Sequence, residues 1–190
     1  MLSRTQLVSL IERAVAEFYV KDAVLLKIRG LERTCASRIA IYLQGLISKE
    51  RGCKRICADC EYGKATDMDG VFLNKQLKGL GITLTRQHKG QVFPDIIVHE
   101  RANHRRNLIV IEIKGAWHER VSCWKHDHKK LQVFTRQTSE MATETSEYFN
   151  YKLGVFLMLG LTKPHYAFYE NGEIVQGKEP KELFRQKDEL

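Results

Sequence analysis

One short segment, NLIVIEIKG from Asn107 to Gly115, constrains the fold more than any other part of the chain. Its apolar residues make it as hydrophobic as a strand that is buried on both faces. Side chains alternate between the two faces of a strand, so each face receives its own set. One face holds Leu108, Val110, Glu112 and Lys114, and the other holds Ile109, Ile111 and Ile113. A carboxylate and an amine at the end of such a strand indicate a functional site.

The length and composition favour a single globular domain. The chain has 190 residues, of which 43% are hydrophobic and 28% are charged. These values are ordinary for a domain with a real core, and the sequence contains no repeat or low-complexity run. We therefore expect one domain over residues 1–190.

The charge balance favours a polyanionic partner. Lysine and arginine number 31 against 23 acidic residues, which gives a formal net charge of +8. Basic side chains that neutralise phosphates release condensed counterions, so nucleic acid is the natural partner. No apolar run is long enough to span a bilayer, and no secretory segment precedes the first helix. With five cysteines and no export signal, we expect reduced thiols, a cytoplasmic location and no membrane partner.

The order of periodic segments predicts a mixed α/β domain. Helical patterns begin near Ser3, where Ser3 and Gln6 form a capping box, and again over 31–50, a helix that we expect Gly52 to end. Strands follow over 54–63, 91–100 and 107–115, and the polar turn 101–107 joins the last two as an antiparallel hairpin. A helix over 127–141, a strand over 151–160 and a hairpin with an Asn171-Gly172 turn complete the order. Residues 64–90 remain loosely assigned.

The hairpin brings acidic residues together. Asp95 lies early in its first strand and Glu112 lies 17 positions later in its second, so the two carboxylates converge on one place in the sheet. Carboxylates that lie close together repel, and a divalent cation removes that cost. Oxygen ligands suit Mg²⁺ or Mn²⁺. Lys114 lies on the same face as Glu112, where it would serve a metal-bound water. Burial and the metal lower the pKa of Lys114, and the carboxylates oppose this.

These residues resemble a known signature. Pro94-Asp95 followed by Glu112-Ile113-Lys114 is similar to the motif of the PD-(D/E)xK nuclease superfamily, the restriction-endonuclease-like proteins. The resemblance covers roughly residues 25–160, with the first helix and the last hairpin as additions, and is closest to a bacterial branch of unassigned role. It implies a mixed sheet flanked by helices and a Mg²⁺-dependent endonuclease activity, with DNA favoured over RNA.

The resemblance also implies roles for individual residues. Asp95 and Glu112 match the metal ligands, with the backbone carbonyl of Ile113, and Lys114 matches the catalytic lysine. Glu32 in the preceding helix matches a further metal ligand. Asp127 and Lys130, in the helix after the motif, match positions that touch the substrate.

Each site residue also has a simpler interpretation. Glu112 and Lys114 would form an exposed ion pair of little energetic value. Glu32 would lie on a solvated helix face, and so would Asp127 and Lys130. Arg38 would either bind phosphate or pair with a carboxylate, and Arg105 and Arg106 in the polar turn would contact the nucleic-acid backbone. Glu61, with Asp59 on the same face, has a weaker claim to the site.

The cysteines allow a different function. Cys53, Cys57 and Cys60 would hold zinc with His88 or Cys35, although strand alternation points Cys57 and Cys60 to opposite faces. A second group, His118, His126 and His128 near Cys123, fits no standard ligand spacing and reads better as a phosphate-facing loop. Two rivals to the nuclease therefore stay open: a nucleic-acid-binding protein with weak catalysis, and a zinc-stabilised interaction protein. A homodimer or a partner protein would serve double-strand cutting.

Overall fold

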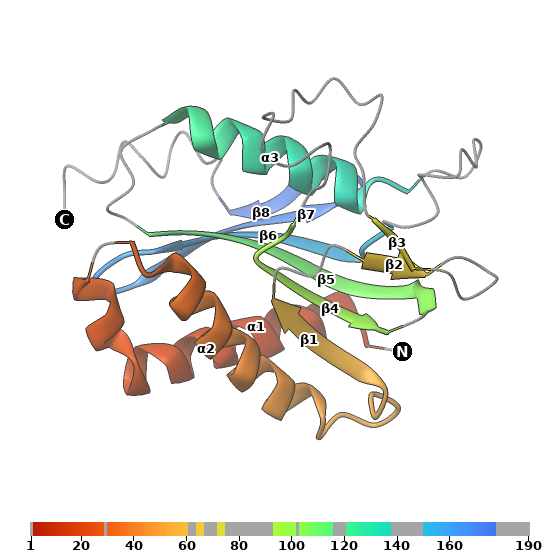
Figure 1. The fold of residues 1–190 in the computed structure, drawn as a ribbon, viewed down its shortest axis with the longest axis horizontal. Helices are drawn as coiled ribbons and strands as arrows, with labels where there is room; N and C mark the ends of the chain where they lie inside the picture. Colours follow the sequence, from red (N-terminus) through yellow and green to blue (C-terminus); the bar gives the residue numbers. More distant parts are fainter. Residues whose placement is uncertain are drawn as a thin grey trace.

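The protein is a three-layer α/β structure in which one mixed sheet separates two layers of helix (Figure 1). The computed structural model describes residues 2–28, 30–60, 64–66, 72–74, 93–101, 103–115, 121–137 and 150–177. Helices α1 and α2 cover one face of the sheet, and α3 covers the other (Figure 1). The predicted mixed α/β class is therefore confirmed.

Six strands form the central sheet in the order β1-β4-β5-β6-β7-β8. Neighbouring strands run antiparallel except β5 and β6, which run parallel. The strands are β1 (Ile56–Cys60), β4 (Ile96–Glu100), β5 (Asn103–Gly115), β6 (Leu153–Leu159), β7 (Pro164–Glu170) and β8 (Glu173–Gly177). A separate two-stranded sheet pairs β2 (Lys64–Thr66) with β3 (Phe72–Asn74).

The first two helices share one core with the sheet. Helix α1 (Arg4–Lys21) begins at Ser3 with the predicted capping box, because Ser3 and Gln6 exchange side-chain-to-backbone hydrogen bonds. A short 3₁₀ helix, η1 (Ala23–Lys27), leads towards α2 (Glu32–Ile47). We call the resulting cluster the α1–α2 core; its buried members include Leu10, Phe18, Ile39, Leu43 and Ile111. Helix α2 ends at Ile47, before the predicted stop at Gly52, which instead adopts a φ of 80° in the turn that follows.

Helix α3 (Val121–Thr135) packs on the opposite face. Its core, the α3 core, includes Val110, Trp124, Leu131, Phe134 and Phe156. The approach is close at Gly154 in β6, where a Cβ atom would lie 2.8 Å from Cγ2 of Thr135 and 3.1 Å from Cβ of Tyr169. Only glycine therefore fits there without a shift of the helix.

The structure corrects two details of the central hairpin. Strand β5 begins at Asn103, so most of the turn predicted over 101–107 is strand. Its register with β4 shifts between Val98 and His99, whose partners are Ile109 and Asn107. Leu108 is the extra residue of this bulge, and it packs in the α1–α2 core rather than on the face of Val110. The prediction for Leu108 was wrong because simple alternation assumes an unbroken ladder.

Of the other elements, the last hairpin has its predicted turn, whereas helix α3 is displaced from its predicted bounds. Asn171 and Gly172 have φ values of 49° and 83°, as the predicted hairpin turn requires. Helix α3 begins at Val121, six residues before the predicted start, and ends at Thr135. Among the described residues, none of the helices has the length and apolar character needed to cross a membrane.

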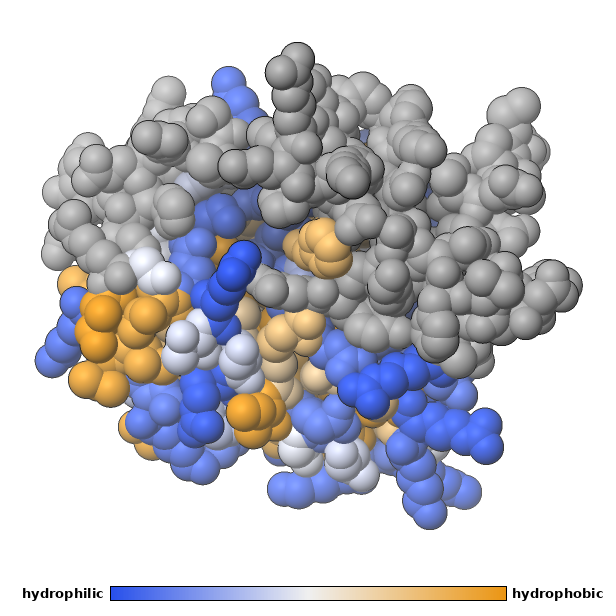
Figure 2. All heavy atoms as spheres, in the orientation of Figure 1, coloured by the Kyte–Doolittle hydropathy of each residue, from blue (hydrophilic) through white to orange (hydrophobic). Residues whose placement is uncertain are grey.

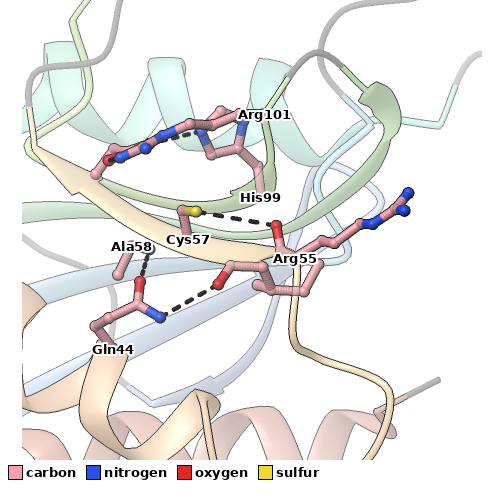
Figure 3. Close-up of polar contacts among 8 residues, drawn as sticks. Gln44, Arg55, Cys57, Ala58, His99 and Arg101 are labelled. Carbon is pink, nitrogen blue, oxygen red and sulfur yellow. Dashed lines mark hydrogen bonds and ion pairs between the residues drawn. The ribbon is translucent and has the colours of Figure 1, made fainter.

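The edge strand β1 is tied to α2 by Gln44. Its Oε1 accepts a hydrogen bond from the backbone N–H of Ala58 at 2.8 Å, and its Nε2 donates to the carbonyl of Ile56 at 3.2 Å. Figure 3 shows this amide on one side of β1, with His99 and Arg101 on the other. The contacts satisfy backbone groups that an edge strand otherwise leaves open to another chain.

Candidate functional site

The ends of β4 and β5 bring the predicted carboxylates to the same place. Ile96 pairs with Ile111 and Ile97 with Val110, so the same register sets Asp95 opposite Glu112, one residue before β4 begins. Directly opposed residues of antiparallel strands share a face. Val110 and Ile97 belong to the α3 core, and Glu112 therefore faces α3. Oδ2 of Asp95 accepts a hydrogen bond from the backbone N–H of Ile113 at 2.6 Å, which fixes this carboxylate against β5.

Lys114 lies among three elements. Its Nζ is 3.0 Å from Oδ2 of Asp127 on α3 and 4.0 Å from Oε2 of Glu32 on α2. It also donates to the carbonyl of Ile113 at 3.2 Å. Glu32 is itself fixed, because its Oε1 accepts a hydrogen bond from the N–H of Gly115 at 2.7 Å. Glu32 is thus bound to the end of β5 and is not a free charge on a solvated helix face.

Lys130 links the strand to α3. Its Nζ lies 2.6 Å from Oε2 of Glu112 and 2.8 Å from Oδ1 of Asp127. Asp127 and Lys130 are three residues apart, so they project from the same side of the helix. Both are buried, with 4% and 8% of their surface exposed. Their interpretation as solvated helix charges is therefore wrong, because α3 turns this side towards the sheet.

Glu112 is the most deeply buried acid of the site. Only 1% of its surface is exposed, and its Oε1 has no hydrogen-bond partner among the described residues. Buried polar atoms are nearly always hydrogen-bonded, so this oxygen has the capacity to accept a further ligand.

Burial dominates the electrostatics of the carboxylates opposite each other. It raises the pKa of Asp95 and that of Glu112, and the charges of Asp127 and Asp95 raise the pKa of Glu112 further while Lys130 opposes them. Burial also works to raise the pKa of Asp127, but Lys130 and Lys114 outweigh it and the net shift is downward. Asp127 is therefore the firmly ionised acid of the group.

The lysines respond in the opposite sense. Burial works to lower the pKa of Lys114, but the surrounding acids outweigh it, with Asp127 as the largest contributor, and the net shift is upward. The same balance raises the pKa of Lys130 through Glu112 and Asp127. Burial therefore lowers the pKa of Lys114 and the carboxylates oppose it, as predicted, and without a metal ion the carboxylates have the larger effect. Both amines stay charged at neutral pH.

The candidate ligand atoms are of the chemical type that a hard divalent cation prefers. Asp95, Glu112, Glu32 and the carbonyl of Ile113 offer only oxygen, which Mg²⁺ and Mn²⁺ prefer. With Asp127, four carboxyl groups face two ammonium groups, and burial disfavours the charged forms of Asp95 and Glu112. In the described part of the chain, however, no three acidic, histidine or cysteine side chains converge as a ready metal cluster. The acids contact lysines and backbone amides instead.

Arg38 serves a different contact. Its Nε lies 2.9 Å from Oδ2 of Asp22, and its Nη2 donates to the hydroxyl of Tyr42 at 2.7 Å. The Tyr42 hydroxyl donates to the same Asp22 carboxylate. These contacts join the end of α1 to α2, which is the carboxylate pairing left open by the sequence. None of these contacts joins Arg38 to Lys114.

Arg106 lies at the other end of the hairpin. Its Nη1 is 2.7 Å from Oε2 of Glu100, and its Nη2 donates to the carbonyl of Gly52 at 3.2 Å. With Lys54 and Arg55 these residues line a pocket of about 430 Å³. Hydrophilic residues gather at the lower right of Figure 2, over the chain between α2 and β1. Arg106 precedes Glu112 by six positions, or about 20 Å along a strand. The side chain of Arg105 lies outside the described residues.

One polar cluster was not predicted from the sequence. Asp59 on β1 accepts a hydrogen bond from Nε of Arg101 at 2.9 Å and lies 3.1 Å from Nε2 of His99. Arg101 and His99 lower the pKa of Asp59, and Arg101 has the larger effect. The only indication of this cluster in the sequence was that strand alternation places Asp59 on the same face as Glu61. Its suggested companion, Glu61, lies outside the described residues.

The described cysteines form no metal-binding group. Cys35, Cys53 and Cys57 are free thiols, and strand alternation in β1 places Cys57 and Cys60 on opposite faces, as predicted. Cys60 packs against the α1–α2 core. In the second predicted group, Nδ1 of His128 lies 2.7 Å from the Tyr169 hydroxyl. His88, His118 and the side chain of Cys123 are outside the part of the chain that the structure describes.

No protein-family model matches the sequence, and no curated protein matches it either. Function is therefore inferred from the residues and their geometry.

Proposed function

We propose that this protein is a metal-dependent nuclease of the restriction-endonuclease-like class that hydrolyses phosphodiester bonds, with DNA as the favoured substrate. The observation that carries the proposal is the meeting of Asp95, Glu112 and Lys114 at the paired ends of β4 and β5, with the buried Oε1 of Glu112 lacking a partner. Such a group of acids beside a lysine matches the parts that phosphodiester hydrolysis requires.

Each residue has a separate task in the proposed mechanism. A bound Mg²⁺ or Mn²⁺ supplies Lewis-acid stabilisation of the charge that develops on the phosphate. Asp95, Glu112, Glu32 and the carbonyl of Ile113 would hold that cation. Lys114 orients the attacking water and donates hydrogen bonds to the reacting phosphate. Asp127, 3.0 Å from Lys114, keeps the ammonium charged and fixed in position.

The distribution of basic residues supports a polyanionic substrate. The chain carries a formal charge of +8, and Lys54, Arg55 and Arg106 line one pocket at the hairpin end of β4 and β5. A nucleic-acid backbone presents phosphates over distances far longer than the 20 Å or so that separates this pocket from Glu112. One substrate therefore reaches both places, and the pocket holds a phosphate that does not react.

A second function is favoured by the lysine contacts. Lys114 and Lys130 each contact Asp127, and Lys130 also contacts Glu112, so the acids already have counter-ions. This arrangement supports a protein that binds nucleic acid with weak catalysis. The described cysteines supply no comparable support for a zinc-stabilised interaction protein.

A cleavage assay separates the functions. Plasmid, linear duplex, single-stranded DNA and RNA are each incubated with the protein in Mg²⁺, Mn²⁺ or EDTA, and Asp95→Asn serves as the inactive control. Cleavage that requires metal and Asp95 supports the nuclease. Binding without cleavage under every condition supports the binding protein. The ratio of linear to nicked plasmid then tests for a homodimer with two sites.

A further inference from the structure

The ammonium group of Lys130 lies beside the carboxylate of Glu112, which a divalent cation would also bind. This ammonium group is 2.6 Å from Oε2 of Glu112 and 2.8 Å from Oδ1 of Asp127, and only 8% of the residue is exposed. A buried ammonium so close to a carboxylate neutralises most of the charge that attracts a metal. The other oxygen of that carboxylate, Oε1, has no partner among the described residues.

Glu112 and Asp127 differ in their dependence on Lys130. Asp127 has a second amine, because Nζ of Lys114 lies 3.0 Å from its Oδ2. Among the described residues, Glu112 forms its ion pair with Lys130. If Lys130 leaves Glu112, it keeps Asp127 as a partner, one turn away on the same helix. The contact with Glu112 is therefore the one that a bound cation would replace, because the cation would supply the positive charge that Lys130 gives up there.

We propose that Lys130 is a built-in counter-ion that competes with the divalent cation for Glu112, so that metal binding and the Lys130–Glu112 contact exclude each other. The inference rests on the proposed function. It assigns Lys130 a part in metal affinity, whereas the sequence resemblance implies contact with the substrate. Because a 2+ ion on Oε1 and an ammonium on Oε2 of one carboxylate repel, cation binding moves Lys130 to Asp127 alone.

Calorimetric titration with Mn²⁺ tests the competition. Lys130→Gln removes the charge and keeps a hydrogen-bond donor, so it should bind Mn²⁺ on the order of tenfold more tightly than the parent, the effect of a nearby like charge. Lys130→Arg keeps the charge and should bind as the parent does. Lys129→Gln removes one charge from the exposed side of the same helix and controls for long-range repulsion of the cation. It should change the affinity by less than about threefold.

Amine labelling tests the same idea in the unaltered protein. Acetic anhydride should modify Lys130 slowly in EDTA and several-fold faster in saturating Mn²⁺, with Lys129 as the internal reference for mass spectrometry. Equal Mn²⁺ affinity of the parent and Lys130→Gln, or a Lys130 that stays protected while Mn²⁺ binds, would overturn the inference and leave the nuclease intact. If neither protein binds Mn²⁺, the metal-dependent function fails together with the inference.

Discussion

Replacing Lys114 by alanine tests the proposed mechanism most directly. The amine has three contacts: Oδ2 of Asp127 at 3.0 Å, the carbonyl of Ile113 at 3.2 Å and Oε2 of Glu32 at 4.0 Å. Each of the three groups that Lys114 contacts is still held by another contact in the variant. Asp127 keeps Lys130 at 2.8 Å, Glu32 keeps the N–H of Gly115, and Ile113 remains within the β5–β6 pair.

Lys114→Ala is expected to reduce both the stability of the fold and the rate of cleavage, by different amounts. Breaking a buried ion pair costs about 3–5 kcal/mol when it leaves a charge without a partner, and here the retained lysine reduces the loss to about 1–2 kcal/mol. For a chain of this length that corresponds to a fall in Tm of about 2–8 °C. Loss of a positioned electrostatic group in the reaction costs about 100-fold or more in rate. Lys114→Ala should therefore fold and be almost inactive.

Single-turnover cleavage in Mg²⁺ gives the rate, and circular dichroism gives the folded fraction at the assay temperature. Lys129→Ala, an exposed residue of the following helix, is the matched control and should keep the parental rate. If Lys114→Ala cleaves as fast as the parent, the nuclease mechanism is wrong whatever the fold. A variant that is unfolded at the assay temperature would instead refute the claim that Lys130 suffices for Asp127.

Three further outcomes follow from other contacts. Glu112→Gln should abolish the rise of Tm with Mg²⁺, and in EDTA it should melt no lower than the parent, because burial already raises the pKa of Glu112 and disfavours its charge; a parental Mg²⁺ response would contradict this. The pKa of Asp59 is lowered by Arg101, so its charge stabilises the fold above the unfolded pKa of 3.8, and this is lost as pH falls through the folded pKa. Asp59→Asn should therefore lower the free energy of unfolding in urea at pH 7, with a difference that shrinks below about pH 4; a constant difference down to pH 3 would rule this out. Replacing Lys54 and Arg55 together by Gln should reduce the salt dependence of DNA binding, measured by fluorescence anisotropy, by about two phosphate contacts, and an unchanged slope would remove the pocket from the interface.

The central hairpin was predictable from the sequence because its geometry is local. Strand alternation and the short connection predict that Asp95 and Glu112 converge on one place in the sheet, and the register of β4 and β5 at that end sets them opposite each other. The bulge at Leu108 was not predictable, since nothing in an aliphatic run marks the residue that leaves the ladder.

The helical part of the site was harder to predict for a tertiary reason. Asp127 and Lys130 have the residue types of a solvated helix face, and only the docking of α3 buries them. The upward pKa shift of Lys114 follows from the same docking, because Asp127 contributes most to it among the acids. The sequence left two partners possible for Arg38, a phosphate or a carboxylate. In the structure Arg38 pairs with the carboxylate of Asp22, at the end of α1.

The single parallel pairing in the sheet has a consequence for how the protein folds. The antiparallel pairs β4–β5, β6–β7 and β7–β8 join segments that are close in the sequence. The parallel pair β5–β6 forms only after the chain from Gly115 to Leu153, which includes α3, has closed a long loop. Loop closure of that length is slow compared with hairpin formation. The β5–β6 seam is thus expected to form after both hairpins. The loop that it closes carries α3, so Lys130, which contacts Glu112, belongs to the segment that this later step encloses.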